Sequence, residues 1–245
     1  MTLLATVTTA AAPRLGYDVA HEPVCYSRTV NDWICPAYLT DRHAQLVDAT
    51  VEHLWITAAA VLLGLAIAFP LALLARRHTR LESAIVGSAT TLYTIPSLAL
   101  FPLLVPFTGI TATTVVVGLA LYALTILVRA LLDGLRAVPG EVVESATGLG
   151  YGSMGLLWRV ELPLALPVVM AGLRVATVST VALTTVGTLV AHGGLGNLIS
   201  DGVFSNFRAE LLAACVLCVL LAVALDLLLV GVQRLLTPWT RTAAG

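Results

Sequence analysis

Long apolar segments separated by short polar ones run through most of this chain of 245 residues. A helix crosses the hydrocarbon core of a membrane with about 20 predominantly apolar residues. Segments of that length cover residues 54–75, 84–107, 111–132, 164–190 and 211–236. Backbone amides inside lipid must be paired within their own segment, so these segments are expected to be helices. The pattern predicts an all-α polytopic membrane protein with about five core spans inside a transmembrane domain at 51–237.

Composition supports this fold class. Hydrophobic residues make up 58% of the chain and charged residues only 11%, whereas a soluble domain carries about 25% charged residues. The chain cannot bury so much apolar surface inside itself, so lipid must cover part of it. The net charge of −1 gives no basic surface, and we expect no nucleic-acid partner.

The arginines indicate how the spans are oriented, because positive charges gather on the cytoplasmic side. With the N-terminus outside, eight arginines fall on the inner side and four on the outer side. The inner group is Arg76, Arg77, Arg80, Arg129, Arg136, Arg159, Arg234 and Arg241, and the outer group is Arg14, Arg28, Arg42 and Arg208. We therefore predict an external polar segment at 1–50 and a cytoplasmic tail at 238–245.

Two pairs of cysteines have different surroundings. Cys25 and Cys35 lie in the external segment, where a disulfide can persist, although two unpaired thiols are the alternative. Cys215 and Cys218 have the CxxC spacing of metal or redox sites, but they lie among Leu and Val in the fifth span. We expect these two to be packing residues, and we expect no metal site.

Polar residues inside the spans are candidates for function. Arg174 lies near the middle of the fourth span, where an arginine costs about 2.5–3.5 kcal/mol on insertion scales. It is expected to face protein or water, and a structural ion pair with Asp226 or Asp133 is favoured over a place on a solute path. A proton site is the alternative for Asp226.

The second predicted span contains prolines that are expected to kink or end it. Pro96 lies between two hydroxyl residues, Thr94 and Ser97, in the sequence TIPS. Hydroxyl side chains can pair with the carbonyls that a proline frees. Thr94, Pro96 and Ser97 therefore either line a translocation path or form a packing kink.

The stretch between the third and fourth spans, 133–163, ends in the sequence EVVESATGLGYGSMGLLWRVELP. Glu141 and Glu144 follow a Pro-Gly pair and suit the positive N-terminus of a helix. Glycines are expected to end that helix, a second short helix is expected over 153–160, and Pro163 suits the first turn of the fourth span. The loop either lies on the membrane surface or docks a cytoplasmic partner.

The spacing of this stretch resembles the cytoplasmic loop signature of ABC-importer permeases: Glu-Ala-Ala, three residues, Gly, nine residues, then Ile-x-Leu-Pro. Ser replaces the first Ala here, and Val replaces the Ile. The matching positions are Glu144, Ser145, Ala146, Gly150, Val160, Glu161, Leu162 and Pro163.

The resemblance implies that the loop is a coupling helix, with Glu144, Ala146 and Gly150 at the contact with a cytoplasmic ATPase dimer. It also implies a second permease subunit, an external substrate-binding protein and a bacterial cell membrane. This chain has no GxxxxGK[ST] phosphate loop. We expect it to be non-catalytic and without a cofactor, with ATP and Mg²⁺ bound by the ATPase.

Three further segments, 48–57, 94–110 and 193–202, resemble permeases for osmoprotectants such as glycine betaine, choline and carnitine. The sequence therefore predicts the permease subunit of an ATP-driven importer for such solutes. A permease of the same superfamily for methionine or a sulfonate is the runner-up. An ion-coupled secondary transporter is disfavoured because it would need more intramembrane acids and commonly an inverted repeat. An intramembrane enzyme is disfavoured because no HExxH or GxSxG motif is present.

Overall fold

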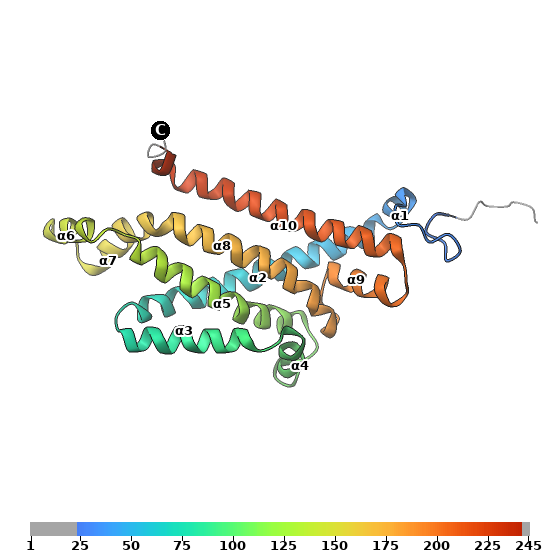
Figure 1. Ribbon diagram of the computed structural model, residues 1–245, viewed down its shortest axis with the longest axis horizontal. Coiled ribbons are helices and arrows are strands. Elements are labelled where there is room, and N and C mark those ends of the chain that lie inside the picture. Colours follow the sequence, from blue (N-terminus) through green and yellow to red (C-terminus); the bar gives the residue numbers. More distant parts are fainter. Residues whose placement is uncertain (1–23, 242–245) are drawn as a thin grey trace, which may run out of the picture.

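The computed structural model describes residues 24–241 and is all-α in that part of the chain, with no strand (Figure 1). This confirms the predicted fold class. The helices are α1 (Pro36–Asp41), α2 (His43–Ala75), α3 (Thr79–Thr94), α4 (Ser97–Thr108), α5 (Ala112–Arg136), α6 (Gly140–Gly148), α7 (Ser153–Leu156), a π-helix (Leu157–Glu161), α8 (Leu162–Thr184), a 3₁₀-helix (Thr185–Val190), α9 (Leu195–Phe204), α10 (Arg208–Leu236) and a 3₁₀-helix (Pro238–Arg241).

Four helical segments in the described part are long and apolar enough to cross a membrane: α2, α5, the continuous stretch Ser153–Val190 that contains α8, and α10. They match four of the five predicted spans. α2 begins at His43, well before the predicted start of the first span at residue 54. The prediction is late because the first turns of α2 carry polar residues, which the hydropathy pattern assigns to the external segment.

The second predicted span, 84–107, is a bent pair of helices, with the break at one of the prolines that are expected to kink or end it. α3 and α4 meet at 101°. The break falls at Ile95, because a residue that precedes a proline is driven out of the helical region and Ile95 is extended at ψ 126°. The hydroxyl of Tyr122 on α5 donates a hydrogen bond to the carbonyl of Ile95, so this carbonyl is not left unpaired. The segment is a broken span or a re-entrant loop.

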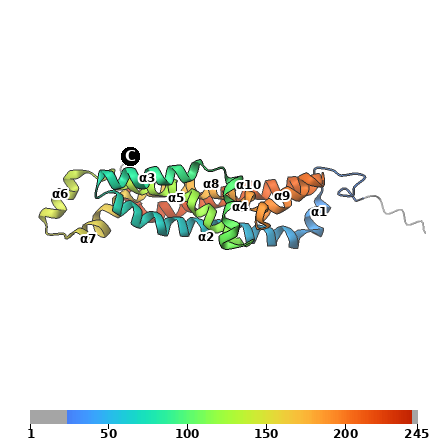
Figure 2. The same cartoon turned by 90° about the horizontal axis from the view of Figure 1, so that it is seen from below.

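α5 lies at the centre of the bundle and packs between α2 and α8, as Figures 1 and 2 show. Small residues permit these contacts. A Cβ at Gly64 of α2 would meet Ala120 and Ala123 at 3.3 Å, and a Cβ at Gly172 of α8 would overlap that of Ala130. Close helix–helix approach through glycine and alanine is the usual way in which spans associate in lipid.

The molecule has two functional ends. We call the end that holds α6, α7 and the C-terminal end of α10 the loop end (Figure 1). We call the opposite end, which holds residues 24–41 and α9, the disulfide end. α10 runs between them along the outside of the bundle, and the most apolar part of it has no buried residue. Lipid or another chain must therefore cover most of α10.

Candidate functional site

The signature-bearing loop forms a short helix, α6, that extends beyond the spans at the loop end (Figure 2). Glu141 occupies its first turn, where a negative charge is favourable. The side chains of Glu144 and Ser145 are exposed, whereas Ala146 is buried. α6 therefore has an inner face that packs on the loop and an outer face that is free for another molecule.

Gly150 reverses the chain after α6. Its φ of +87° lies in the left-handed region, which residues with a side chain rarely adopt. Its N–H donates to the carbonyl of Thr147 at 3.0 Å, and the N–H of Tyr151 donates to that of Ala146 at 3.2 Å. No atom lies within 4 Å of the position that a Cβ would take. The backbone conformation, and not space, is therefore what requires glycine here.

Large apolar side chains are exposed around this reversal. The exposed fractions are 81% for Leu149, 66% for Met154 and 57% for Trp158. Glu144, on α6 of the same loop, is exposed as well. A mixed apolar and acidic surface of this kind, beyond the ends of the spans, has the chemistry of a protein-contact surface.

The chain returns from the loop into the membrane without a break. The sequence predicts a separate helix at 153–160, but α7 passes through the π-helix directly into α8, which corrects that expectation. Leu162 and Pro163 form the start of α8. Because Glu161 before it is also helical, Pro163 does not begin a free helix as the sequence predicts, but follows directly on the π-helix inside a continuous helical segment. The signature thus ends at Pro163, near the start of α8, where the continuous helix enters the bundle of spans.

Glu161 lies in the signature but has no predicted role, and it is the most buried acid of the loop. Its side chain is 7% exposed, and it accepts two hydrogen bonds of 2.8 Å from the guanidinium of Arg76 at the end of α2. A bidentate arginine–carboxylate pair has a fixed mutual orientation. Arg76 was noted in the sequence only as a marker of orientation. No sequence signal joins the two residues, because 85 positions separate them.

The residues at the break between α3 and α4 are accessible. Thr94 and Pro96 are exposed, and Ser97 is half-buried. The hydroxyl of Thr94 donates to the carbonyl of Thr91 at 2.7 Å, so it caps its own helix. One face of α3 continues this accessible surface with small and polar residues: Ser83, Ala84, Gly87, Ser88 and Thr91.

Arg174 and Asp226 lie together between α8 and α10. The Nε and one terminal nitrogen of Arg174 donate to the two carboxylate oxygens of Asp226 at 2.7 and 2.8 Å. About a third of each side chain is exposed. The two charges neutralise each other inside the spans, and Asp133 is not the partner of Arg174 in this pair.

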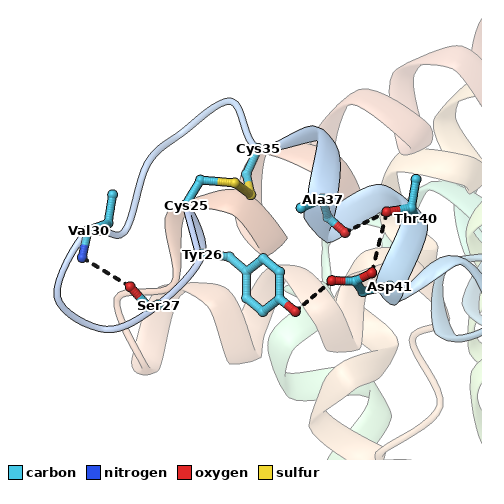
Figure 3. Close-up of a disulfide and its surroundings, with 8 residues drawn as sticks. All are labelled: Cys25, Tyr26, Ser27, Val30, Cys35, Ala37, Thr40 and Asp41. Atoms are coloured by element: carbon cyan, nitrogen blue, oxygen red, sulfur yellow. Dashed lines mark hydrogen bonds between the residues drawn. A yellow bond between two sulfur atoms is a disulfide. The ribbon is translucent and has the colours of Figure 1, made fainter. Parts of the chain in front are cut away.

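Cys25 and Cys35 form a disulfide, with Cα atoms 5.7 Å apart (Figure 3). Beside it the hydroxyl of Tyr26 donates to Asp41 at 2.8 Å, and this hydrogen bond raises the pKa of Tyr26. Residues 24–41 therefore form an ordered cap. Residues 1–23 of the predicted external segment and 242–245 of the predicted tail lie outside the described residues.

The cap is attached to the turn between α9 and α10. The amide nitrogen of Asn31 donates to the carbonyl of Asn206 at 2.7 Å, and its oxygen accepts from the N–H of Arg208 at 3.0 Å. The ring of Tyr38 packs edge-on against that of Phe207, with centroids 5.3 Å apart. The cap thus holds the beginning of α10 in place through Asn31, within the disulfide loop, and Tyr38, after it.

The comparison with family models decides the identity of the chain. Residues 53–242 match the model described as "Binding-protein-dependent transport system inner membrane component". The chain belongs to this family. Members of this family of permeases are typically non-catalytic membrane subunits of transporters, and the several apolar helices agree with a multi-pass protein of a bacterial membrane.

Curated permeases of this family cover most of the chain. It is 36% identical to the "Osmoprotectant import permease protein OsmW" of Salmonella typhimurium, over 82% of this chain and 96% of that protein. It is 32% identical to the "Carnitine transport permease protein OpuCB" of Listeria monocytogenes, over 84% of this chain and 94% of that protein. It is also 32% identical to the "Choline transport system permease protein OpuBD" of Bacillus subtilis, over 85% and 92%.

A solved structure shows the same permease fold. A chain of the MetNI methionine ABC transporter in an inward-facing conformation superposes with a TM-score of 0.73, over 80% of this chain and 98% of that chain. Its sequence identity is 21%, so the likeness concerns the fold alone. The four spans and the bent pair α3–α4 therefore belong to an architecture of ABC-importer permeases.

Proposed function

We propose that this chain is the membrane-spanning permease subunit of an ATP-driven importer for osmoprotectants that carry a quaternary ammonium, such as glycine betaine, choline and carnitine. The relatives with this chemistry in their names cover more than four fifths of the chain. The structural observation that carries the proposal is the exposed loop between α5 and α8. Its signature residues Glu144, Ser145 and Gly150 are exposed and lie outside the helices that qualify as spans, where a soluble subunit can reach them.

A cytoplasmic ATPase dimer is the partner of the loop end in this proposal. Glu144, Ser145 and the exposed Leu149 supply its contact surface, Ala146 and Gly150 shape it, and Leu162 and Pro163 carry it into α8. Rigid-body movement of a short helix can be passed on to the helices it continues into. ATP and Mg²⁺ bind the ATPase, because this chain lacks a phosphate-binding loop.

The proposed orientation places the loop end in the cytoplasm and the disulfide end outside. The arginines at the loop end, among them Arg76, Arg77 and Arg136, support it. The disulfide supports it too, since disulfides persist in oxidising compartments. An external substrate-binding protein would then deliver the solute at the disulfide end.

A second permease subunit completes the solute path in this proposal. α3 offers an accessible face of small and polar residues that ends at Thr94, Pro96 and Ser97. Such a face is poorly suited to lipid and well suited to a helix interface or a wet path. We assign Arg174 and Asp226 to structure and not to transport, because their charges are mutually paired.

The test is uptake of radiolabelled glycine betaine and choline by cells with and without the gene. A Glu144→Lys, Gly150→Asp double variant is measured beside them, because both changes alter the contact surface without touching the spans. Loss of uptake in the deletion and in the double variant, with the variant present in the membrane at the wild-type amount, is the expected result.

Radiolabelled methionine serves as the comparison solute. Unchanged uptake of glycine betaine, choline and carnitine in a deletion strain that has no other importer for them would reject the substrate class. Loss of methionine uptake instead would support the runner-up solute. Normal uptake by the double variant would reject the role of the loop.

A further inference from the structure

Two contacts join α2 to the π-helix that follows the loop. One is the bidentate pair of Arg76 and Glu161. The other is the packing of the ring of Phe69 against that of Trp158, with centroids 5.8 Å apart. Phe69 and Arg76 lie two turns apart along α2, so the two contacts together fix the position and the direction of the π-helix relative to α2. We call these four residues the α2 joint.

The burial of the pair is unequal. The carboxylate side chain of Glu161 is 7% exposed, whereas the side chain of Arg76 is 35% exposed. A buried carboxylate is stable only with a partner that stays in place. A Glu161 carboxylate that stayed buried without Arg76 would be costly, so the two side chains are expected to move together.

The joint coincides with an irregular turn. Residues 157–161 have π-helical hydrogen bonding between two α-helical segments. π-turns inside helices are rare and occur frequently at functional sites. In this chain the π-turn separates the loop helix α7 from the span α8, at the one place where both are tied to a third helix.

We propose that the Arg76–Glu161 pair is a positioning element that passes movement of the loop to α2 as well as to α8, and so keeps ATP hydrolysis coupled to transport. The inference rests on the proposed function. α8 follows the loop through the chain itself. α2 is separated from the loop by 85 residues; it packs on α5 and α8 further along, and the joint adds a direct link between its end and the π-helix that leaves the loop.

The consequence of this link is that α2 and α8 move as one body. α5 packs between them, so a shift of α8 alone would strain the contact of Gly172 with Ala130. If the joint moves α2 and α8 together with α5 packed between them, the three helices shift as one group and the contact of Gly172 with Ala130 is kept. Packed interfaces respond to small shifts in discrete steps and not by gradual deformation.

The experiment uses the complete transporter, purified with its ATPase and binding protein and placed in lipid vesicles. ATP hydrolysis and solute uptake are measured together, and their ratio is the readout. For Glu161→Gln we expect hydrolysis to continue and uptake per ATP to fall about tenfold. The exchange Arg76→Glu with Glu161→Arg should restore most of the ratio, because it rebuilds the pair in reverse.

A matched control is Glu82→Gln. It removes a charge from the ion pair between Arg136 of α5 and Glu82 of α3, which lies at the same end of the molecule but involves neither α2 nor the π-helix. The expected ratio for this variant is that of the wild type. If both changes only weakened the loop end in general, uptake per ATP would fall alike in Glu161→Gln and Glu82→Gln. That result would overturn the proposal.

If Glu161→Gln does not assemble, the double variant Arg76→Leu, Glu161→Leu replaces it. Apolar replacement of both members of a buried pair often preserves stability, but it removes the bidentate orientation. A low uptake per ATP in this variant supports the proposal. Wild-type uptake per ATP in this double variant, or in Glu161→Gln, overturns the proposal. So does a low uptake per ATP in Glu161→Gln that the charge exchange of Arg76 and Glu161 does not raise. Absence of ATP-driven uptake in the wild type would instead reject the proposed function.

Discussion

Gly150 has a backbone requirement that its neighbour Gly148 lacks. Gly150 has φ +87° and Gly148 is helical, and a Cβ at either would meet no atom within 4 Å. Gly150→Ala should cost about 1–2 kcal/mol for a left-handed residue. We expect this cost to appear as weaker binding of the ATPase, measured as its dissociation constant for the purified permease.

Gly148→Ala is the control for this change. It adds the same methyl group two residues earlier, in a helical conformation where alanine is preferred to glycine. Binding of the ATPase should be unchanged. Equal weakening by both variants would mean that the methyl group itself obstructs the partner, and that the turn at Gly150 is not the cause.

The pair of Arg174 and Asp226 gives a second prediction at the residue scale. Asp226→Asn leaves the guanidinium without its carboxylate inside the spans and should lower the thermal stability of the protein. The double variant Arg174→Leu, Asp226→Leu removes both charges and should recover most of that loss. The measurement is the temperature of half-aggregation in detergent, beside uptake. Normal uptake and normal stability in Arg174→Leu alone would contradict a structural role.

At the scale of elements, the contact between α5 and α8 depends on Gly172. A Cβ at this position would overlap that of Ala130, so Gly172→Ala forces the helices apart and should cost about 1–3 kcal/mol. Adding Ala130→Gly should restore the thermal stability and the yield of inserted protein. Gly231→Ala on α10, where no atom lies within 4 Å, is the neutral control.

The long apolar elements are predictable from the sequence, because a span needs only length and hydropathy. A kink at the prolines of the second span is predictable too, but which proline breaks the helix is not: Pro70, Pro102 and Pro106 lie inside helices, whereas the chain breaks at Ile95 and Pro96. At this break the hydroxyl of Tyr122 on α5 donates a hydrogen bond to the carbonyl of Ile95. Such a partner comes from another helix and leaves no mark on the local pattern.

The loop shows the same limit. Its signature and its reversal at Gly150 follow from residue types and spacing. The role of Glu161 does not, because a carboxylate next to a Leu-Pro sequence is expected to be a solvated charge. Its burial depends on the end of α2 lying beside the π-helix, and that depends on the packing of α2, α5 and α8 as a group.

At the scale of the whole molecule, the proposed orientation predicts which surface an impermeant reagent reaches. In intact spheroplasts, Thr147→Cys at the loop end should resist a membrane-impermeant maleimide, and Ser27→Cys at the disulfide end should react. Both side chains are exposed or close to the surface, so access and not burial decides the outcome. Permeabilised cells should label at both positions. Labelling of Thr147→Cys alone in intact spheroplasts would reverse the orientation.

The attachment of Asn31 to the turn before α10 has a consequence for synthesis of the protein. The disulfide joins positions only 10 apart, so it can form soon after the segment crosses the membrane. The docking site of Asn31 on Asn206 lies 175 positions further along the chain, so it does not exist until those positions have been synthesised. During translation the cap can be closed by its disulfide while still undocked, and it can dock only once the turn before α10 has formed.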